Sequence, residues 1–292
     1  MQNNGSKHSG TLTDEQIAFY ELEGYLVLPD FLTREDMAPA QEAMEEKVDQ
    51  IANELFADGL IADRLTSEPF ATRLAKLFEN LTDKEFLKYG RSWRDRYPGY
   101  FKLMSNSKIL DAVESLLGPE IFSSPVYNVR PKVPKVAAGT IPWHQDRSYW
   151  PDTIAAPIMT VWIPLVDATP ENGCLSVIPR THHRRLLSFH KETYTGTGYT
   201  ELDEEHIQAP HAEVISLPLA AGGAILFNDK FIHSSTANNS DHVRWSVDLR
   251  YQPVDQDPMT RIGLGFLARS RLRPNCVATL EDWLANRPEH VC

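Results

Sequence analysis

From Ile121 onward the sequence changes from helical spacing to short runs rich in β-branched residues, and this change constrains the fold most strongly. Pro, Gly and Asn separate the runs, as is typical of strands joined by turns. No alternating βαβ rhythm and no Gly-rich phosphate loop is present, which argues against Rossmann and P-loop enzymes. We therefore predict a mainly β fold, an antiparallel sandwich or jelly roll with helices covering one sheet. The expected strands are Ile121–Arg130, Ile158–Val166, Cys174–Ile178, Val214–Leu217, Ala224–Phe227 and Arg244–Tyr251.

The first 118 residues have the spacing and caps of helices. Thr13–Gln16 has the form of a capping box and opens a short helix that should stop at Gly24, before a strand at Tyr25–Pro29. Thr33 begins a second helix, although Pro39 lies late for a first turn and leaves its start open. The apolar stripe of this helix consists of Met44, Val48, Ile51, Leu55 and Phe56. Further helical segments are expected at Phe70–Phe78, Thr82–Tyr89 and Lys108–Leu117.

The length of 292 residues lies within the range of a single barrel or sandwich. Residues 1–12 (Met1 to Leu12) are polar and rich in Gly and Ser, and we expect a disordered tail there. Residues 13–292 are expected to form one domain. Its parts would be helices to about residue 118, a jelly-roll core at about 119–253 and a C-terminal extension at 254–292.

The composition argues against several classes of partner. A formal net charge of −11 disfavours nucleic acid and anionic membrane surfaces. No apolar signal segment and no bilayer-spanning stretch is present, so a cytoplasmic location is the default. Three dispersed cysteines, Cys174, Cys276 and Cys292, imply no disulfide framework, and the lack of C-x-x-C argues against a structural zinc ribbon.

Trp143-His144-Gln145-Asp146 is the first candidate for chemistry. On an extended backbone, His144 and Asp146 point the same way and could hold two adjacent positions on a metal ion. A second histidine would complete a 2-His-1-carboxylate triad, which leaves one face of Fe(II) open. The best third ligand is His233, which follows a strand end. Five other histidines are expected to have no metal role: His182, His183, His190, His206 and His211, while His242 is expected to be exposed in a turn.

Arg244 lies eleven residues after His233, at the start of the next expected strand. A strand returning antiparallel from the intervening turn would bring Arg244 alongside the metal site. That arrangement suits 2-oxoglutarate, whose far carboxylate needs a fixed cation. Arg250 is the rival, because it should face the same way; it could instead bind an anionic substrate or pair with Asp248 or another acid.

Three motifs, taken together and in order, resemble the phytanoyl-CoA dioxygenase family of non-haem Fe(II)/2-oxoglutarate oxygenases. They are W-H-Q-D, then E-N-G-C-L-S-V-I-P-R-T-H-H (Glu171 to His183), then H-S-S-T-x-N with an arginine eleven residues after its histidine. The opening T-D-E-Q-I-A-F-Y-E-L-E-G-Y-L-V-L-P-D-F-L is also similar to that family. The likeness runs from about Leu12 to Pro253, and it implies a double-stranded β-helix, also called a jelly roll.

The resemblance implies a role for each matching residue. His144, Asp146 and His233 would bind iron, and Arg244 would bind the 5-carboxylate of 2-oxoglutarate. Three further positions match co-substrate contacts of the family: Trp162, Ser235 and Asn128. The implied reaction uses Fe(II) and O2, converts 2-oxoglutarate to succinate and CO2, and hydroxylates a small molecule. Related halogenases replace the carboxylate ligand with a small residue, so the presence of Asp146 favours hydroxylation.

Alternatives stay open at this stage. A cupin-like zinc hydrolase or isomerase could use the same three ligands, and a binding module with a vestigial site is a third hypothesis. Trp93–Phe101 could form a lid or substrate wall or simply pack, and Ser188–Ala212 could be a solvated insertion or a lid. The weaker substrate-contact candidates are Arg147, Tyr149, Tyr127 and Lys132. Acyl-CoA, an amino acid, a phosphonate and a secondary metabolite are all conceivable substrates, and the sequence gives no oligomeric state.

Overall fold

The computed structural model describes residues 10–90, 93, 95–150, 157–195, 197–207, 213–254 and 265–285. Its strands are β1 (Tyr25–Leu28), β2 (Ile121–Ser123), β3 (Asn128–Lys132), β4 (Ile141–Gln145), β5 (Met159–Pro164), β6 (Leu175–Val177), β7 (Phe189–Lys191), β8 (Thr200–Leu202), β9 (Ile215–Leu217), β10 (Ala224–Asn228), β11 (Ile232–Ser235), β12 (Arg244–Pro253) and β13 (Phe266–Arg269). Its helices are α1 (Asp14–Glu23), α2 (Arg34–Ala57), α3 (Phe70–Phe78), α4 (Asp83–Glu85), α5 (Pro98–Met104), α6 (Ser107–Leu117) and α7 (Leu280–Leu284), with a π-helical turn η1 at Phe86–Gly90.

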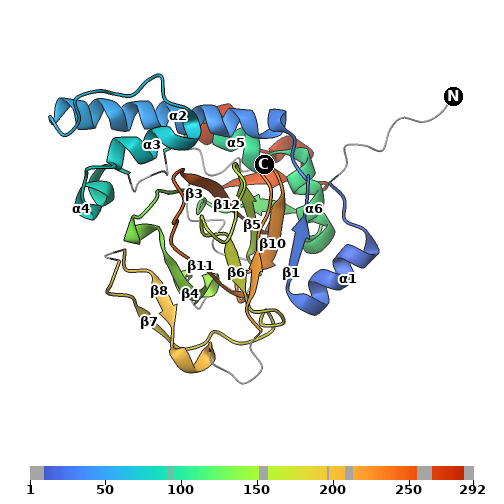
Figure 1. The fold of residues 1–292 in the computed structure, drawn as a ribbon. Coiled ribbons are helices and arrows are strands. Elements are labelled where there is room, and N and C mark those ends of the chain that lie inside the picture. The colour runs from blue at the N-terminus through green and yellow to red at the C-terminus, as the bar shows by residue number, and fades with distance from the viewer. Residues whose placement is uncertain are drawn as a thin grey trace.

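Two antiparallel sheets form the body of the molecule (Figure 1). The larger has the order β1-β10-β5-β12-β2-β13, with β3 also paired to β12; the smaller has the order β4-β11-β6-β9. β7 and β8 form a separate hairpin. Helices α2, α3, α5 and α6 cover the larger sheet on one side. The fold is therefore the predicted one, mainly β with flanking helices and a jelly-roll core.

Alternation along β12 divides the two sides of the larger sheet. Val247, Leu249 and Tyr251 belong to the core shared with the helices. The residues between them are polar and buried on the other side: Arg244, Ser246, Asp248 and Arg250. Successive side chains of a strand point to opposite faces, so one strand supplies both an apolar core and a charged interior. This confirms that Arg244 and Arg250 face the same way.

Local sequence signals account for the helix ends. Thr13 closes the predicted capping box with Gln16, and Gly24 ends α1 in the left-handed conformation at φ 87°. Thr33 forms a second capping box, so α2 begins at Arg34 and Pro39 lies inside it. Phe56, which we expected on the buried stripe of α2, is 39% exposed. The start of α2 is thus set by its cap and not by Pro39.

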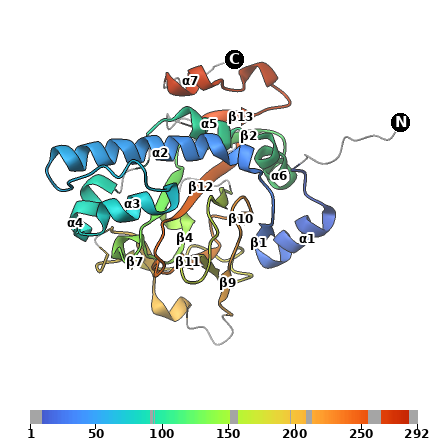
Figure 2. The same ribbon diagram turned by 45° about the horizontal axis from the view of Figure 1, so that its top comes forward.

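Other boundaries differ from the prediction. The single strand expected at Ile121–Arg130 is two strands, because the register against β12 shifts between them. Ser123 pairs with Tyr251 and Asn128 pairs with Asp248, so residues 124–127 lie opposite only Leu249 and Arg250 and leave the regular ladder. The segment expected as a helix at Thr82–Tyr89 is a short α4 followed by η1. The C-terminal extension adds β13 to the larger sheet and packs α7 beside α5 (Figure 2).

The start of the described chain packs against α6, and two of the cysteines differ in their bonding. Residues 1–9 of the expected tail lie outside the described residues, while Gly10 and Leu12 are buried and hydrogen-bond to α6. Cys276 is disulfide-bonded, contrary to the expectation from three dispersed cysteines, and Cys174 is free and buried.

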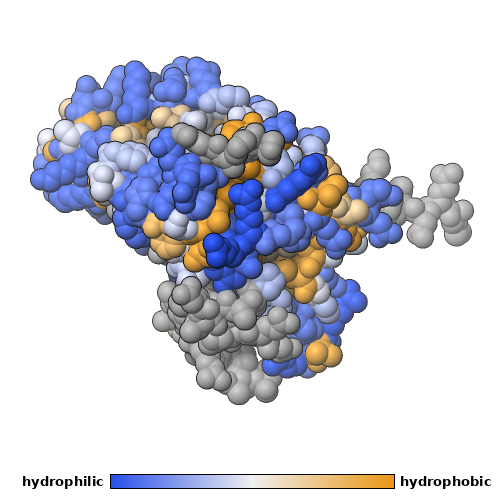
Figure 3. Space-filling view, turned by 90° about the horizontal axis from the view of Figure 1, so that it is seen from below, coloured by the Kyte–Doolittle hydropathy of each residue, from blue (hydrophilic) through white to orange (hydrophobic). Residues whose placement is uncertain are grey.

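None of the described helices is long and apolar enough to cross a membrane. Seen from below, the coloured surface is mostly hydrophilic, with hydrophobic patches toward its middle and its right-hand side (Figure 3).

Candidate active site

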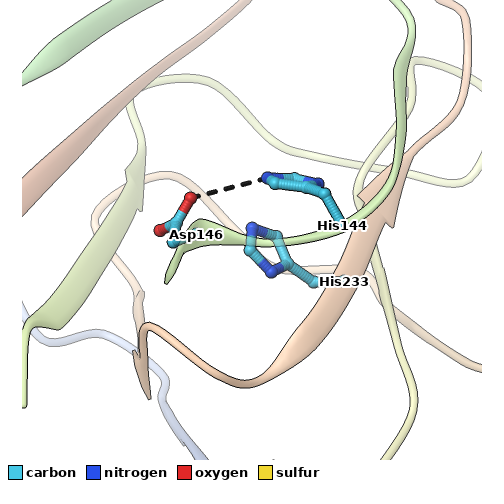
Figure 4. Close-up of side chains that lie close together, drawn as sticks. All are labelled: His144, Asp146 and His233. Atoms are coloured by element: carbon cyan, nitrogen blue, oxygen red, sulfur yellow. Dashed lines mark ion pairs between the residues drawn. The ribbon is translucent and has the colours of Figure 1, made fainter. Parts of the chain in front are cut away.

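The strand pair β4–β11 brings the two candidate histidines together. His144 and His233 are direct partners in the antiparallel register, with ring centroids 4.1 Å apart. Asp146 lies just beyond the end of β4, beside both rings (Figure 4). One ligand atom from each of the three residues lies within 4.8 Å of the others, and all three are buried. Two imidazoles and a carboxylate therefore meet at one point, as the motifs predicted.

Each imidazole is oriented by its own strand. Nδ1 of His144 lies 2.9 Å from the carbonyl oxygen of Pro142, and Nδ1 of His233 lies 3.0 Å from that of Phe231. A proton donated from Nδ1 in both rings leaves each Nε2 as a free lone pair, the tautomer a metal ligand needs. Burial and the neighbouring His144 lower the pKa of His233 to about 3, so this ring is neutral at pH 7.

Asp146 is held by partners that occupy only one of its oxygens. Oδ2 accepts hydrogen bonds from the Thr160 hydroxyl (2.8 Å) and from Nη2 and Nε of Arg250 (2.9 and 3.2 Å). Oδ1 lies 3.5 Å from Nε2 of His144, the contact drawn in Figure 4. Burial alone would raise the pKa of Asp146, but Arg250 and the histidines hold it well below its usual range. Oδ1 thus belongs to an ionised carboxylate and faces the two imidazoles.

Ion pairs extend from Asp146 across the interior. Arg250 Nη2 lies 3.8 Å from Asp248 Oδ2, and the same oxygen accepts a hydrogen bond from Nε of Arg130 (2.5 Å). Cations and carboxylates therefore alternate in the order Arg130, Asp248, Arg250, Asp146. Arg250 therefore pairs mainly with Asp146. Of the expected roles for Arg250, the structure shows pairing with an acid other than Asp248.

Arg244 lies across a small cavity from the histidines. That cavity is also bordered by Trp162, Ser235 and Asp248. The guanidinium carbon of Arg244 is 5.5 Å from the centroid of the Trp162 ring, and its Nη1 donates to Ser246 Oγ (2.5 Å). Burial lowers the pKa of Arg244 to about 10, and its Nε has no hydrogen-bond partner among the described residues. This guanidinium is suited to receiving an anion.

Lys132 adds a second buried basic side chain beside Arg244. Its ammonium donates to Ser235 Oγ and to the Thr236 carbonyl oxygen, both uncharged. Burial and the nearby Arg244 place the pKa of Lys132 well below its usual range. The sequence had marked Lys132 only as a weak substrate contact, because its pairing opposite Arg244 depends on the register between β3 and β12.

A larger cavity of about 410 Å³ adjoins the site, and both cavities are bordered by Arg130, Ile141 and Arg244. Its apolar wall comes from η1 and from Trp93, which also packs edge-on against Trp245 at 5.1 Å. Its polar wall includes Asn128, Thr197 and Tyr199. The Trp93–Phe101 and Ser188–Ala212 segments thus each contribute to this cavity, through Trp93 in the first and through the β7–β8 connection in the second.

The remaining expected site residues are less central. Asn128 borders the larger cavity only, with Nδ2 3.5 Å from Asp248 Oδ2. His182 lies against the Glu21 carbonyl (3.0 Å), and His242 pairs with exposed Asp241. Among the described residues, only His144, Asp146 and His233 form a group that could hold a metal ion. His211 lies outside those residues.

The E-N-G motif is structural. The Asn172 side chain accepts from the Thr169 N–H and donates to the Asp167 carbonyl (2.8 Å each). Gly173 has φ 79°, and a Cβ there would lie 2.4 Å from the Thr236 carbonyl oxygen. Only glycine fits this close approach, so the motif holds the start of β6 against the segment after β11.

The sequence matches the family described as Phytanoyl-CoA dioxygenase (PhyH) over residues 20–246. It is 26% identical over 261 residues to Phytanoyl-CoA dioxygenase domain-containing protein 1 of Danio rerio, covering 80% of this chain and 87% of that protein. It is 25% identical over 258 residues to the ectoine dioxygenase of Sphingopyxis alaskensis, covering 83% and 76%.

Three solved structures share the fold. The carbocyclase SnoK from nogalamycin biosynthesis has a TM-score of 0.59 at 18% identity, covering 93% of each chain. EctD from S. alaskensis with 2-oxoglutarate and 5-hydroxyectoine has 0.54 at 20%, covering 88% and 80%. The epimerase SnoN with Fe3+, alpha ketoglutarate and nogalamycin RO has 0.52 at 19%, covering 87% and 85%.

Proposed function

Because this chain belongs to the phytanoyl-CoA dioxygenase family, we propose that it is an Fe(II)/2-oxoglutarate-dependent oxygenase that hydroxylates a small molecule. The observation that carries the proposal is the meeting of His144, Asp146 and His233, with ligand atoms within 4.8 Å of one another. This donor set, two imidazoles and one carboxylate, is the facial triad of Fe(II) oxygenases.

The three ligands would hold the iron through Nε2 of each histidine and Oδ1 of Asp146. Bound iron, with O2, supplies the oxidative decarboxylation of 2-oxoglutarate and the attack on a substrate C–H bond. The chain supplies orientation: the Pro142 and Phe231 carbonyls fix the two rings. Arg250 and Thr160 fix the carboxylate from the side away from the ligand oxygen.

Arg244 would bind the 5-carboxylate of 2-oxoglutarate, with Ser235 and Trp162 beside it. The fit rests on two features of this structure: the Nε of Arg244 is buried without a partner, and Lys132 next to it bonds only neutral oxygens. Two buried basic side chains, neither bonded to a carboxylate, favour an anionic ligand at this end, because an anion stabilises their charged forms. Asn128 is proposed as a more distant contact, because it borders the adjoining cavity.

Hydroxylation is the outcome we propose among those that this architecture supports. SnoK and SnoN, described as a carbocyclase and an epimerase, share the fold. The carboxylate of Asp146 occupies the position where related halogenases have a small residue, which favours hydroxylation over halogenation. A hydroxylated product from an identified substrate would establish the reaction, and a cyclised or epimerised product would replace hydroxylation while keeping the oxygenase assignment.

The test of the proposal is succinate formation from 2-oxoglutarate by the purified protein. We expect it to require Fe(II) and O2 and to be abolished by Asp146→Ala, while Asp241→Ala, at an exposed acid away from the site, leaves it unchanged. A zinc hydrolase or isomerase using the same ligands predicts the opposite: activity with zinc, without O2, and no response to Arg244→Ala. Failure to bind either metal or 2-oxoglutarate would support a binding module instead.

A further inference from the structure

We propose that the substrate of this site is an amphipathic organic acid whose anionic group binds at Arg130 and Tyr199 and whose apolar body lies against η1 and Trp93. The inference deepens the proposed function and rests on it, because it assumes that 2-oxoglutarate occupies the Arg244 end. It identifies the chemistry of the substrate, which the metal ligands do not specify.

The 410 Å³ cavity has two chemically different walls. One wall is apolar and is formed by Phe86, Leu87 and Trp93, with Val129 and Ile141 at its edges. The other carries Arg130 and the hydroxyl-bearing residues of the β7–β8 connection, Thr197 and Tyr199. Of the acidic residues described in this structure, none borders this cavity. A ligand with an apolar body and one anionic end complements both walls.

Arg130 is placed to present its guanidinium to such a ligand. Its Nε donates to Asp248 (2.5 Å), and its Nη1 donates to the Tyr199 hydroxyl (3.3 Å). Its Nη2 has no hydrogen-bond partner among the described residues, and the side chain is 22% exposed. The Tyr199 hydroxyl accepts from Arg130 and keeps its own proton for donation. Arg130 and Tyr199 thus offer two neighbouring donors at the border of the same cavity, a pair that suits a carboxylate or a phosphate.

The charge balance of the two cavities points the same way. The basic side chains that border them are Arg130, Lys132, Arg244 and Arg250. Among the described residues, the carboxylates bonded to this group are Asp146 and Asp248. A divalent metal ion and a doubly charged 2-oxoglutarate cancel, which leaves an excess of two positive charges, or of one if Lys132 is neutral. Buried charge without a counter-ion is costly, so a second anion completes the site.

The test uses the protein loaded with Mn(II) and saturating 2-oxoglutarate, so that the Arg244 end is occupied and no turnover occurs. Isothermal titration calorimetry then compares four ligands with the same chain: decanoate, decyl phosphate, decan-1-ol and decylamine. We expect at least one of the two acids to bind about 10-fold or more tightly than the alcohol and the amine, as a charge-assisted hydrogen bond predicts. The comparison between decanoate and decyl phosphate shows which anionic group the site prefers.

Variants locate the contact. Arg130→Gln should reduce affinity for the acid about 10-fold or more, to the level of the alcohol, and Tyr199→Phe should reduce it by a smaller factor. Arg130→Lys keeps the charge beside Asp248 and should retain part of the preference for acids, which separates loss of the contact from loss of folding. Arg180→Gln removes an arginine that pairs with Glu23 at the surface, and it should leave all four affinities unchanged.

Several results would overturn the inference. Equal affinity for decanoate, decyl phosphate, decylamine and decan-1-ol would do so, as would an unaltered affinity for the acids in folded Arg130→Gln. Competition between the acids and 2-oxoglutarate would place the anion at Arg244 and would also refute it. Failure of 2-oxoglutarate itself to bind would reject the proposed function, and the same titrations on the Mn(II) form alone would then decide this inference separately.

Discussion

Replacing Arg250 with Met should destabilise the metal-free protein strongly. Arg250 makes two of the three hydrogen bonds to Asp146 Oδ2, and both side chains are at most 5% exposed. Breaking a buried ion pair by removing one partner costs about 3–5 kcal/mol, because the other charge is left without compensation. With an unfolding entropy of about 2.1 cal/mol/K per residue, a chain of 292 residues should lose about 5–8 °C in Tm.

The assay is a thermal melt followed by circular dichroism, in the presence of a chelator and then with Mn(II). The dication supplies the counter-charge that Arg250 provided, so Mn(II) should raise the Tm of Arg250→Met at least as much as that of the unaltered protein. Lys76→Met is the control: its side chain is 47% exposed and that of its partner Glu68 is 25% exposed, so solvent screens the pair and we expect a change below about 2 °C. If Arg250→Met lowered the Tm of the metal-free protein no more than the control substitution does, the stabilising role of Arg250 would be refuted.

Three further perturbations test other parts of the structure. Arg244→Met should weaken 2-oxoglutarate binding by about 10- to 150-fold in calorimetry with Mn(II), while Mn(II) affinity stays the same; an unchanged affinity would contradict the co-substrate assignment. Glu192 receives hydrogen bonds from Thr195, Thr197 and Gly198, and although burial opposes them, these bonds lower its pKa to about 2. Because the folded pKa lies below the usual 4.5, the Tm advantage of the unaltered protein over Glu192→Gln should be full above pH 4.5 and shrink as pH falls toward 2; a pH-independent difference would refute this. Gly99→Ala would place a Cβ 1.8 Å from the Pro39 carbonyl oxygen, where α5 crosses α2. The overpacking should cost about 1–3 kcal/mol of stability and lower the Tm by about 2–5 °C. An unchanged Tm would show that α5 can move away from α2 without loss of stability.

The central geometry could be predicted because it follows from local patterns. The two-residue spacing of His144 and Asp146 places them on the same side of an extended chain. Arg244 begins a strand after a short turn, and the alternation along that strand predicts that Arg250 faces the same interior. His233 was expected as the third ligand because it follows a strand end, and the register between β4 and β11 places it directly opposite His144.

The positions of the other side chains in the site depend on the register between strands that are distant in the sequence. No local sequence pattern determines that register. Lys132 and Arg130 reach the site because β3 pairs with β12 opposite Arg244 and Ser246. The prediction merged β2 and β3 into one strand, so it could not place either side chain. The hairpin of β7 and β8 was also missed: its sequence is charged, as a solvated loop would be, although Thr200 and Leu202 are buried.

The direct pairing of His144 with His233 has a consequence for the order of folding. These residues come from distant parts of the sequence, and loop closure on that scale is a slow, late event. Until β4 and β11 pair, the refolding chain can bind a metal ion only through His144 and Asp146, which is an incomplete set of ligands. High-affinity metal binding should therefore report a late step of refolding. In a stopped-flow experiment, it should appear after the circular-dichroism signal of the helices.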